Sequence, residues 1–453
     1  MDQKIKITFC GGTSHVTGAN FLLEYKNSKI LIDCGMLQGT DDAYEFNSRP
    51  FPFEVSEIDV LVVTHAHIDH IGLIPKLAKS GFTGKIISTE YTHELAPYML
   101  QDAARLGMKD ATICKRDPIY TLDDVDAALN MWKGIPYHTS VELTPEVKLL
   151  FKDSGHILGS GIAMLTCGDR VLAFTGDLGN TPSPLLHDTE YVPEADYIVM
   201  ESVYGDRNHP DLAHRQNRLV DELKASLALG GTVLIPIFSL EKTQVLLHEL
   251  NHLFESGILP KTSVYMDSPL ASKVTSVYAR ATKAFNDVAQ KEIQSGDDIF
   301  DFPGLVQIDD REASANVLHM PNPKIIIAGS GMSTGGRIVS HEKLLLGDPK
   351  NSIIFIGYQS VGTLGRRLAD RTPEVTIGGD KVKVNARVSE VEGYSSHKDS
   401  DHLLEFVSHA DKVKKVFVVM GESKSALFLA QKIRDNLGKE AIHPEEGSSV
   451  VLD

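Results

Sequence analysis

Four residues of types that bind metal ions lie within a stretch of six, directly after the apolar residues DVLVVT. They are His65, His67, Asp69 and His70. The apolar residues indicate a strand, and side chains two residues apart at a strand end point the same way. If the following turn brings Asp69 and His70 to a neighbouring point, the stretch can serve two metal ions about 3.5 to 4 Å apart. Nitrogen and oxygen ligands of this kind suit Zn²⁺, with Mn²⁺ or iron as alternatives.

Two glycine-rich turns each carry a further candidate ligand. His156 lies in SGHILGS and Asp177 lies in AFTGDLG, each after an expected strand. Glycine lets the backbone approach an ion without a side-chain clash. Either residue alone is more often an ordinary turn residue, but beside the six-residue stretch both indicate metal ligands. Asp33 ends the strand in LIDCG and could accept a hydrogen bond from a metal-bound histidine, which would fix the tautomer of that ring.

The elements that must position these residues form three segments. Residues 1–205 contain short strands and tight turns, which predict a mostly β domain. Residues 206–372 alternate helices with nearly continuous apolar strands, the pattern of a parallel sheet covered on both faces. In residues 373–453 the β character returns in stretches too short to form a core of their own. We therefore expect an α/β domain inserted into the first domain, with the chain returning after residue 372.

The order of these residues resembles the metallo-β-lactamase superfamily. Asp33, the stretch His65–His70, His156 and Asp177 are similar to its four motifs, in the usual order and at strand ends. The resemblance implies an α/β fold, with an αββα sandwich that provides two metal sites. It also implies that Asp33 and Asp69 belong to the catalytic machinery. Asp69 would also be a metal ligand, and Asp33 would support a ligand.

The later part of the chain resembles the β-CASP branch of nucleases, which would make the insertion a β-CASP domain. Glu201 in MESVYG matches an acidic motif of this branch, and His397 in GYSSH matches a histidine motif. The resemblance implies that the metal ions activate a water for attack on a phosphodiester. His397 would then protonate the leaving oxygen as general acid, while Glu201 orients its ring and supports the protonated form.

The same resemblance suggests where a substrate would bind. The stretches SGMSTGGR and GYQSVGTLGRRL look like β-CASP loops, and their glycines could present backbone N–H groups to phosphates. Ser330, Arg337 and Arg366 in these loops are candidates for substrate binding, together with Ser396 beside the histidine motif. Each basic residue taken singly is more often a solvated surface charge.

One position departs from the pattern of the RNA-cleaving members. They carry a further histidine in V-H-G-E, where this chain has VVMGES and the residue is Met420. A thioether is a poor ligand for hard or borderline ions, so we expect the second metal site to be weaker than the first. DNA-acting members have an apolar residue here, which weakens the argument for RNA. Nothing in the sequence shows whether His443 could substitute.

The composition fits a globular protein of more than one domain. The chain has 453 residues, of which 42% are hydrophobic and 23% charged. No apolar run is long enough to cross a bilayer, and the first residues do not resemble a signal peptide, so we expect a cytoplasmic location and no membrane partner. Its four cysteines (Cys10, Cys34, Cys114 and Cys167) are scattered, which indicates neither a disulfide framework nor a thiolate zinc site.

The charge limits the way in which nucleic acid could bind. Lys and Arg total 45 against 61 Asp and Glu, a formal net charge of −16. This charge argues against nonspecific adhesion to a polyanion, so nucleic acid would have to bind in a local basic groove. Bound divalent ions would offset part of the negative charge. A homo-oligomer or a partner protein that helps to hold the substrate also fits this charge.

Taken together, the sequence predicts a zinc-dependent nuclease that hydrolyses phosphodiester bonds, in single-stranded RNA rather than DNA. Three alternatives stay open: a DNA-acting nuclease, an RNA-binding scaffold subunit with little or no activity, and a small-molecule ester hydrolase of the same superfamily. The inserted domain favours a polymer as substrate, whereas Met420 favours the first two alternatives.

Overall fold

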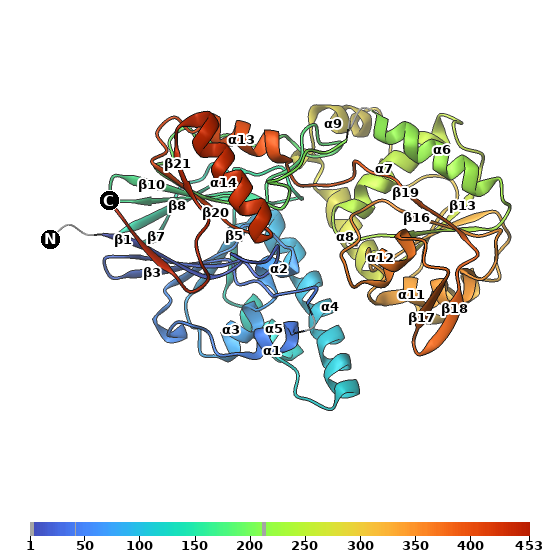
Figure 1. Ribbon diagram of the computed structural model, residues 1–453, viewed down its shortest axis with the longest axis horizontal. Coiled ribbons are helices and arrows are strands. Elements are labelled where there is room, and N and C mark those ends of the chain that lie inside the picture. The colour runs from blue at the N-terminus through green and yellow to red at the C-terminus, as the bar shows by residue number, and fades with distance from the viewer. Residues whose placement is uncertain (1–3, 41, 211–213) are drawn as a thin grey trace. The chain divides into compact units, whose positions relative to one another are not determined.

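The computed structural model describes residues 4–40, 42–210 and 214–453. The chain divides into two compact units (Figure 1). The first contains Met1–Asn208 and Ser396–Asp453, and the second contains His209–Ser395. The insertion expected from sequence is therefore present. Its end lies at Ser395 and not at residue 372.

The first unit is built on two seven-stranded sheets. In spatial order the first sheet contains β22 (Ser449–Leu452), β1 (Ile5–Gly11), β2 (Asn20–Tyr25), β3 (Ser28–Ile32), β4 (Val60–Val62), β5 (Lys85–Thr89) and β6 (Trp132–Ile135). The second contains β21 (Glu440–Ile442), β20 (Lys415–Val418), β11 (Tyr197–Met200), β10 (Arg170–Phe174), β9 (Gly161–Cys167), β8 (Val147–Asp153) and β7 (Val141–Thr144). Both sheets mix parallel and antiparallel pairs.

Apolar side chains from both sheets form the core of this unit. Strand β1 alternates buried and half-buried residues, as its polar and apolar pattern predicts, and it buries Ile5, Ile7 and Phe9. The ring of Phe9 lies 5.3 Å from that of Phe417 in the second sheet, measured between centroids. Packing between two sheet faces holds both sheets in place, and with them the loops at their strand ends.

Helices cover the outer faces of the two sheets (Figure 1). Those on the side of the first sheet are α1 (Ala43–Ser48), α2 (Ile68–Ile71), α3 (Ile74–Lys79), α4 (Glu90–Cys114) and α5 (Leu122–Leu129). Those on the side of the second sheet are α13 (Ser400–Ser408) and α14 (Ser423–Leu437). The layers run helix, sheet, sheet, helix, which confirms the expected αββα sandwich.

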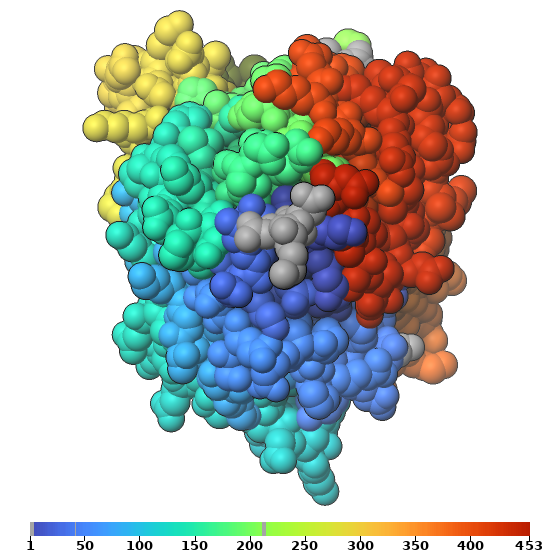
Figure 2. Space-filling view, turned by 90° about the vertical axis from the view of Figure 1, so that its left-hand side faces the viewer, coloured from blue at the N-terminus to red at the C-terminus, as the bar shows by residue number. Residues whose placement is uncertain are grey.

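The returning segment completes both sheets. Strand β22 pairs antiparallel with β1, and β20 inserts beside β11 in the second sheet. Figure 2 shows the face on which the blue N-terminal and red C-terminal segments lie against each other. The chain beyond Ser395 is therefore part of the first unit's own core.

The second unit has a six-stranded sheet in which every described pair of strands is parallel. Its spatial order is β14 (Leu305–Gln307), β13 (Ser263–Asp267), β15 (Lys324–Ala328), β12 (Thr232–Pro236), β16 (Ser352–Phe355) and β19 (Arg387–Glu390). The helices are α6 (Arg215–Leu227), α7 (Lys242–Glu255), α8 (Pro269–Arg280), α9 (Asp287–Gln294), α10 (Arg311–Val317), α11 (Gly336–Leu345) and α12 (Leu364–Ala369).

Two elements explain why the insertion ends later than the sequence predicted. The hairpin of β17 (Glu374–Ile377) and β18 (Asp380–Lys383) buries Val375 and Ile377 in the core of the second unit. Strand β19 then pairs in parallel with β16. The short β segments after residue 372 therefore complete the inserted domain, and the chain returns only at Ser396. Within the part of the chain that the structure describes, no helix is long and apolar enough to span a membrane.

Candidate metal centre

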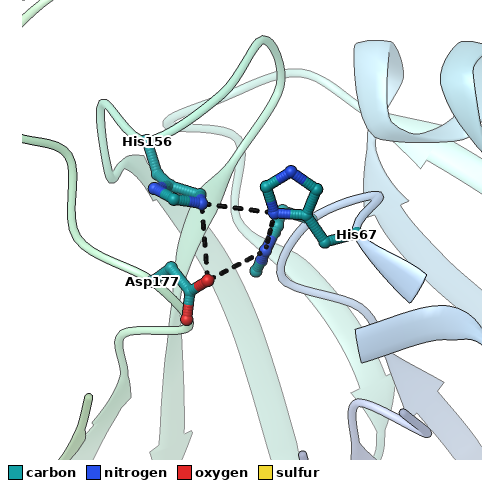
Figure 3. Close-up of side chains that lie close together, drawn as sticks. His67, His156 and Asp177 are labelled. Atoms are coloured by element: carbon teal, nitrogen blue, oxygen red, sulfur yellow. Dashed lines mark hydrogen bonds and ion pairs between the residues drawn. The ribbon is translucent and has the colours of Figure 1, made fainter. Parts of the chain in front are cut away.

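Four candidate ligands of the first unit converge from three separate loops. His65 and His67 follow β4, His156 lies in the turn between β8 and β9, and Asp177 follows β10. Their ligand atoms all lie within 4.8 Å of one another. Figure 3 shows His67, His156 and Asp177 pointing to one place. Residues more than a hundred positions apart in sequence therefore form one site.

The distances within this group suit side chains that share one cation. Oδ2 of Asp177 lies 3.4 Å from Nε2 of His65 and 3.4 Å from Nε2 of His156. Nδ1 of His67 lies 3.1 Å from Nε2 of His65 and 3.3 Å from Nε2 of His156. Three imidazoles that turn nitrogens towards each other and towards a carboxylate fit a Zn²⁺ ion, which takes such donors at about 2.0–2.2 Å.

A second group shares Asp177 with the first. It adds Asp69 and His70, and again the ligand atoms lie within 4.8 Å of one another. Nε2 of His70 lies 3.4 Å from Oδ1 of Asp177 and 3.8 Å from Oδ2 of Asp69. Both Nε2 of His70 and Oδ1 of Asp177 are buried without a hydrogen-bond partner. Buried polar atoms normally have partners, so these orphaned atoms are the sign that an ion belongs here.

Asp33 holds the ring of His70 from the other side. Oδ2 of Asp33 lies 2.7 Å from Nδ1 of His70, and Thr64 donates to both carboxylate oxygens through its backbone N–H and its hydroxyl. A proton on Nδ1 leaves the lone pair of Nε2 facing Asp177. Sequence reasoning missed Thr64, although its place directly before His65 at a strand end was a usable signal.

The electrostatics of the centre favour bound cations. Burial, together with neighbouring histidines, lowers the pKa of His67 and of His156 well below the usual value, which keeps both rings neutral. Burial acts against the charge of Asp177, but His70 and His65 hold the pKa of Asp177 well below its usual range. Burial likewise opposes a charge on His70, yet the surrounding carboxylates raise its pKa well above normal. Neutral His67 and His156 and an ionised Asp177 are in the protonation states in which such side chains bind metal ions.

Glu201 and His397 lie beside the metal groups. Nδ1 of His397 is 3.1 Å from each carboxylate oxygen of Glu201, and a third group of ligand-type atoms joins them to Asp177. Glu201 is fully buried and accepts a hydrogen bond of 2.6 Å from the backbone N–H of Leu178. The side chain of His397 is 24% exposed. The structure thus brings together the two residues that the sequence motifs paired.

Ser396 contacts the centre through its backbone. Its carbonyl oxygen lies 3.1 Å from Nδ1 of His156 and accepts a second bond from the backbone N–H of Asn180. With Nδ1 as donor, Nε2 of His156 is left for a metal. This contact supports a ligand, whereas the sequence suggested Ser396 for substrate binding.

Met420 occupies the position of the histidine that the sequence lacks. It follows β20, is 2% exposed, and lines a small cavity together with His70 and Glu201. A Cβ at Gly12 would lie 2.5 Å from Sδ of Met420, so this glycine makes room for the thioether. His443 does not replace the ligand: its Nδ1 is 2.9 Å from the carbonyl oxygen of Val418, and it joins no described group of ligand-type side chains.

The other candidates for substrate binding lie in the second unit. Arg337 pairs with Asp267, and its guanidinium also donates to the carbonyl of Ile308. Arg366 pairs with Asp370 at 2.9 Å, and Ser330 shares a hydrogen bond with Thr334. A role of these three residues in substrate binding stays a prediction.

Comparison with known families agrees with this geometry. A model of the metallo-β-lactamase superfamily matches residues 16–236, and a model of the Beta-Casp domain matches residues 243–368. A third, the Zn-dependent metallo-hydrolase RNA specificity domain, matches residues 381–444. Ribonuclease TTHA0252 of Thermus thermophilus is 35% identical over 94% of this chain and 95% of its own length. The chain belongs to the β-CASP branch of the metallo-β-lactamase superfamily.

Other relatives cover nearly all of this β-CASP chain. The transcription termination factor FttA of Methanosarcina mazei is 31% identical over 96% of the chain and 70% of its own length. A crystal structure of a protein of unknown function from Enterococcus faecalis covers 99% of the chain with a TM-score of 0.57 and 12% identity, which shows a shared fold. As a β-CASP member, the protein is a metallo-hydrolase, and its cluster of histidines and aspartates fits the zinc of that class.

Proposed function

We propose that this β-CASP protein cleaves phosphodiester bonds in RNA with the metal centre around Asp177. The observation that carries the proposal is the convergence of two largely buried ligand groups on one carboxylate, beside a half-buried histidine paired with a buried glutamate. The model described as an RNA specificity domain and a relative named as a ribonuclease over nearly the whole chain support RNA as the substrate.

The ligand sets follow from the two groups. One zinc ion would be held by His65, His67 and His156, and a second by Asp69 and His70. Asp177 would be a ligand of both ions. When bound, zinc would lower the pKa of a water molecule, and its positive charge would stabilise the phosphate. The protein contributes the orientation of the rings, since Asp33 fixes His70 and the carbonyl of Ser396 fixes His156.

His397 is the proposed general acid. Because Glu201 engages Nδ1, the proton for the leaving oxygen comes from Nε2. The buried carboxylate opposite the ring stabilises its protonated form. The proton leaves Nε2 as the bond between phosphorus and the leaving oxygen breaks, and water restores it.

A second function is favoured by one observation, the thioether at position 420. If the second ion is absent in the cell, the chain would bind RNA and act as a scaffold subunit without cleaving it. The intact first ligand group argues for the nuclease. Met420 is also compatible with DNA as the substrate.

The proposal is tested with end-labelled single-stranded RNA and DNA of the same sequence, incubated with protein of known zinc content. We expect cleavage of RNA in preference to DNA, and no cleavage by His67→Ala. A preference for DNA would reassign the substrate. No cleavage of either strand by zinc-loaded protein would favour the scaffold function.

A further inference from the structure

A separate group of metal-binding residue types lies in the second unit, where the proposed reaction makes no use of it. His248 and His252 belong to α7, and Glu292 belongs to α9. The two histidine nitrogens and one carboxylate oxygen lie within 4.8 Å of one another. This group shares no residue with the Asp177 centre.

The spacing of the two histidines on α7 explains why they meet. Residues four apart in a helix lie one turn apart on the same face. The ring centroids of His248 and His252 are 5.7 Å apart. Both rings turn Nε2 towards Glu292, at 2.7 Å from Oε2 for His248 and 3.1 Å from Oε1 for His252. Two imidazoles therefore converge on one carboxylate, one on each oxygen.

Other contacts join α7 to the segment that follows α9, independently of Glu292. Asn251 of α7 donates to the carboxylate of Asp297, which lies just after α9, at 3.1 Å. Phe254 of α7 also stacks on Phe302, further along the same segment, with ring centroids 5.3 Å apart. Contacts of this kind preorganise ligands, because little chain entropy is lost when an ion binds.

The burial of the three residues suits an ion that enters from solvent. The side chain of His248 is 8% exposed and that of Glu292 is 21% exposed, whereas that of His252 is 57% exposed. In addition, Nδ1 of His248 is buried without a hydrogen-bond partner, so the ring's fixed contacts are made by Nε2 alone. One ligand is thus anchored in the unit, and another borders water that can complete the shell of a metal.

We propose that His248, His252 and Glu292 form a third metal site that binds a borderline divalent ion, of which Zn²⁺ is the first to test. Two imidazole nitrogens and one carboxylate select zinc, cobalt, nickel or copper, because Mg²⁺ and Ca²⁺ require oxygen ligands. The bound ion replaces the two hydrogen bonds to Glu292 and links α7 to α9. It has no part in hydrolysis.

The chain contains a matched control for an ordinary pair of histidine and glutamate. Nε2 of His138 lies 2.8 and 3.0 Å from the two carboxylate oxygens of Glu190, and its side chain is 60% exposed. The exposure is close to that of His252, but no second histidine belongs to this pair in the described metal-binding groups. A His138 variant therefore removes an exposed histidine without removing a proposed ligand.

The test counts zinc ions per chain in full-length protein that has been stripped of metal, reloaded and washed. We expect His252→Ala to bind one ion fewer than both the wild type and His138→Ala, with RNA cleavage unchanged. Glu292→Gln, which keeps a hydrogen-bonding group but loses the charge, should also lose that ion. The exposed position of His252 makes a folding defect unexpected, and circular dichroism checks it.

Three results would overturn the proposal. The same number of ions in His252→Ala and wild type would show that no site exists. An equal loss in His138→Ala would show only nonspecific binding by surface histidines. Full retention of the ion in Glu292→Gln would exclude the three-residue site. None of these results depends on whether the chain cleaves RNA.

Discussion

The two halves of the metal centre share Asp177 but differ in the ligands that surround it. The first half has three imidazoles, from His65, His67 and His156. Burial lowers the pKa of His67 and of His156, which keeps these two rings neutral and ready to bind. The second half has one imidazole and one further carboxylate, and a thioether stands where another histidine would complete it. The ligand count thus varies within one site, and we expect the affinity for zinc to vary with it.

The largest expected difference is between His156→Ala and Asp69→Ala. The first change removes a ligand of the complete half, so the tightly bound zinc and RNA cleavage should both be lost. The second change removes a ligand of the incomplete half, so the tightly bound zinc should stay. The zinc content of each variant is measured after gel filtration. If both variants lost the same ion, the two halves would not be separate sites.

His397→Gln should lower turnover by about 10²- to 10⁴-fold, the contribution of a general acid, and leave the zinc content of both halves unchanged. Single-turnover cleavage of RNA gives the rate, and metal analysis gives the control. A loss of zinc would show that His397 is a ligand, and the ligand sets of the two halves would then have to be reassigned.

Asp33→Asn should weaken zinc binding in the second half by about 10- to 100-fold, as expected when the partner of a metal-bound histidine is altered. Asp33 has a φ of 57°, a conformation that asparagine also adopts readily, so the fold should be retained. Competition with a chromogenic chelator measures the affinity. An equal effect on the tighter site would contradict the assignment of Asp33 to His70.

The smallest expected effect is on stability, and it concerns a buried carboxylate that has no histidine partners. Asp177 is surrounded by histidines, whereas in the second unit Glu342 has Oε2 buried without a partner, and burial raises the pKa of Glu342 to about 7. The pKa of Glu342 is thus higher in the folded state than in the unfolded chain. The stability contributed by its protonated carboxyl group is fully present below the unfolded pKa and is lost as the pH rises through about 7.

Glu342→Gln should therefore raise the melting temperature by a few degrees at pH 8 and by less at pH 5.5. Ser333 can still donate to the amide oxygen. Differential scanning calorimetry at the two pH values checks this, with the exposed Glu374→Gln as control. A gain independent of pH would show that the carboxylate is not the cause.

Local sequence patterns predicted much of this centre. The apolar strands before His65 and Asp177, and the turns after them, follow from short-range periodicity, and they placed the ligands at strand ends. The convergence of these ends came from the family resemblance, because strand order depends on pairing between distant residues. The same limit explains the end of the insertion: nothing local in Arg387–Glu390 shows that its partner is β16. The bonds between Thr64 and Asp33 likewise depend on the pairing of β3 with β4, which brings the two strand ends together.

The central claim, two unequal halves around Asp177, is tested most directly by calorimetric titration of zinc into metal-free protein. The His252→Ala chain is used, so that the site between α7 and α9 does not contribute. We predict one tight and one weak site, and two tight sites once Met420→His is added. Histidine tolerates the φ of 46° at this position at least as well as methionine. Two equally tight sites without that change, or no tightening with it, would contradict the account.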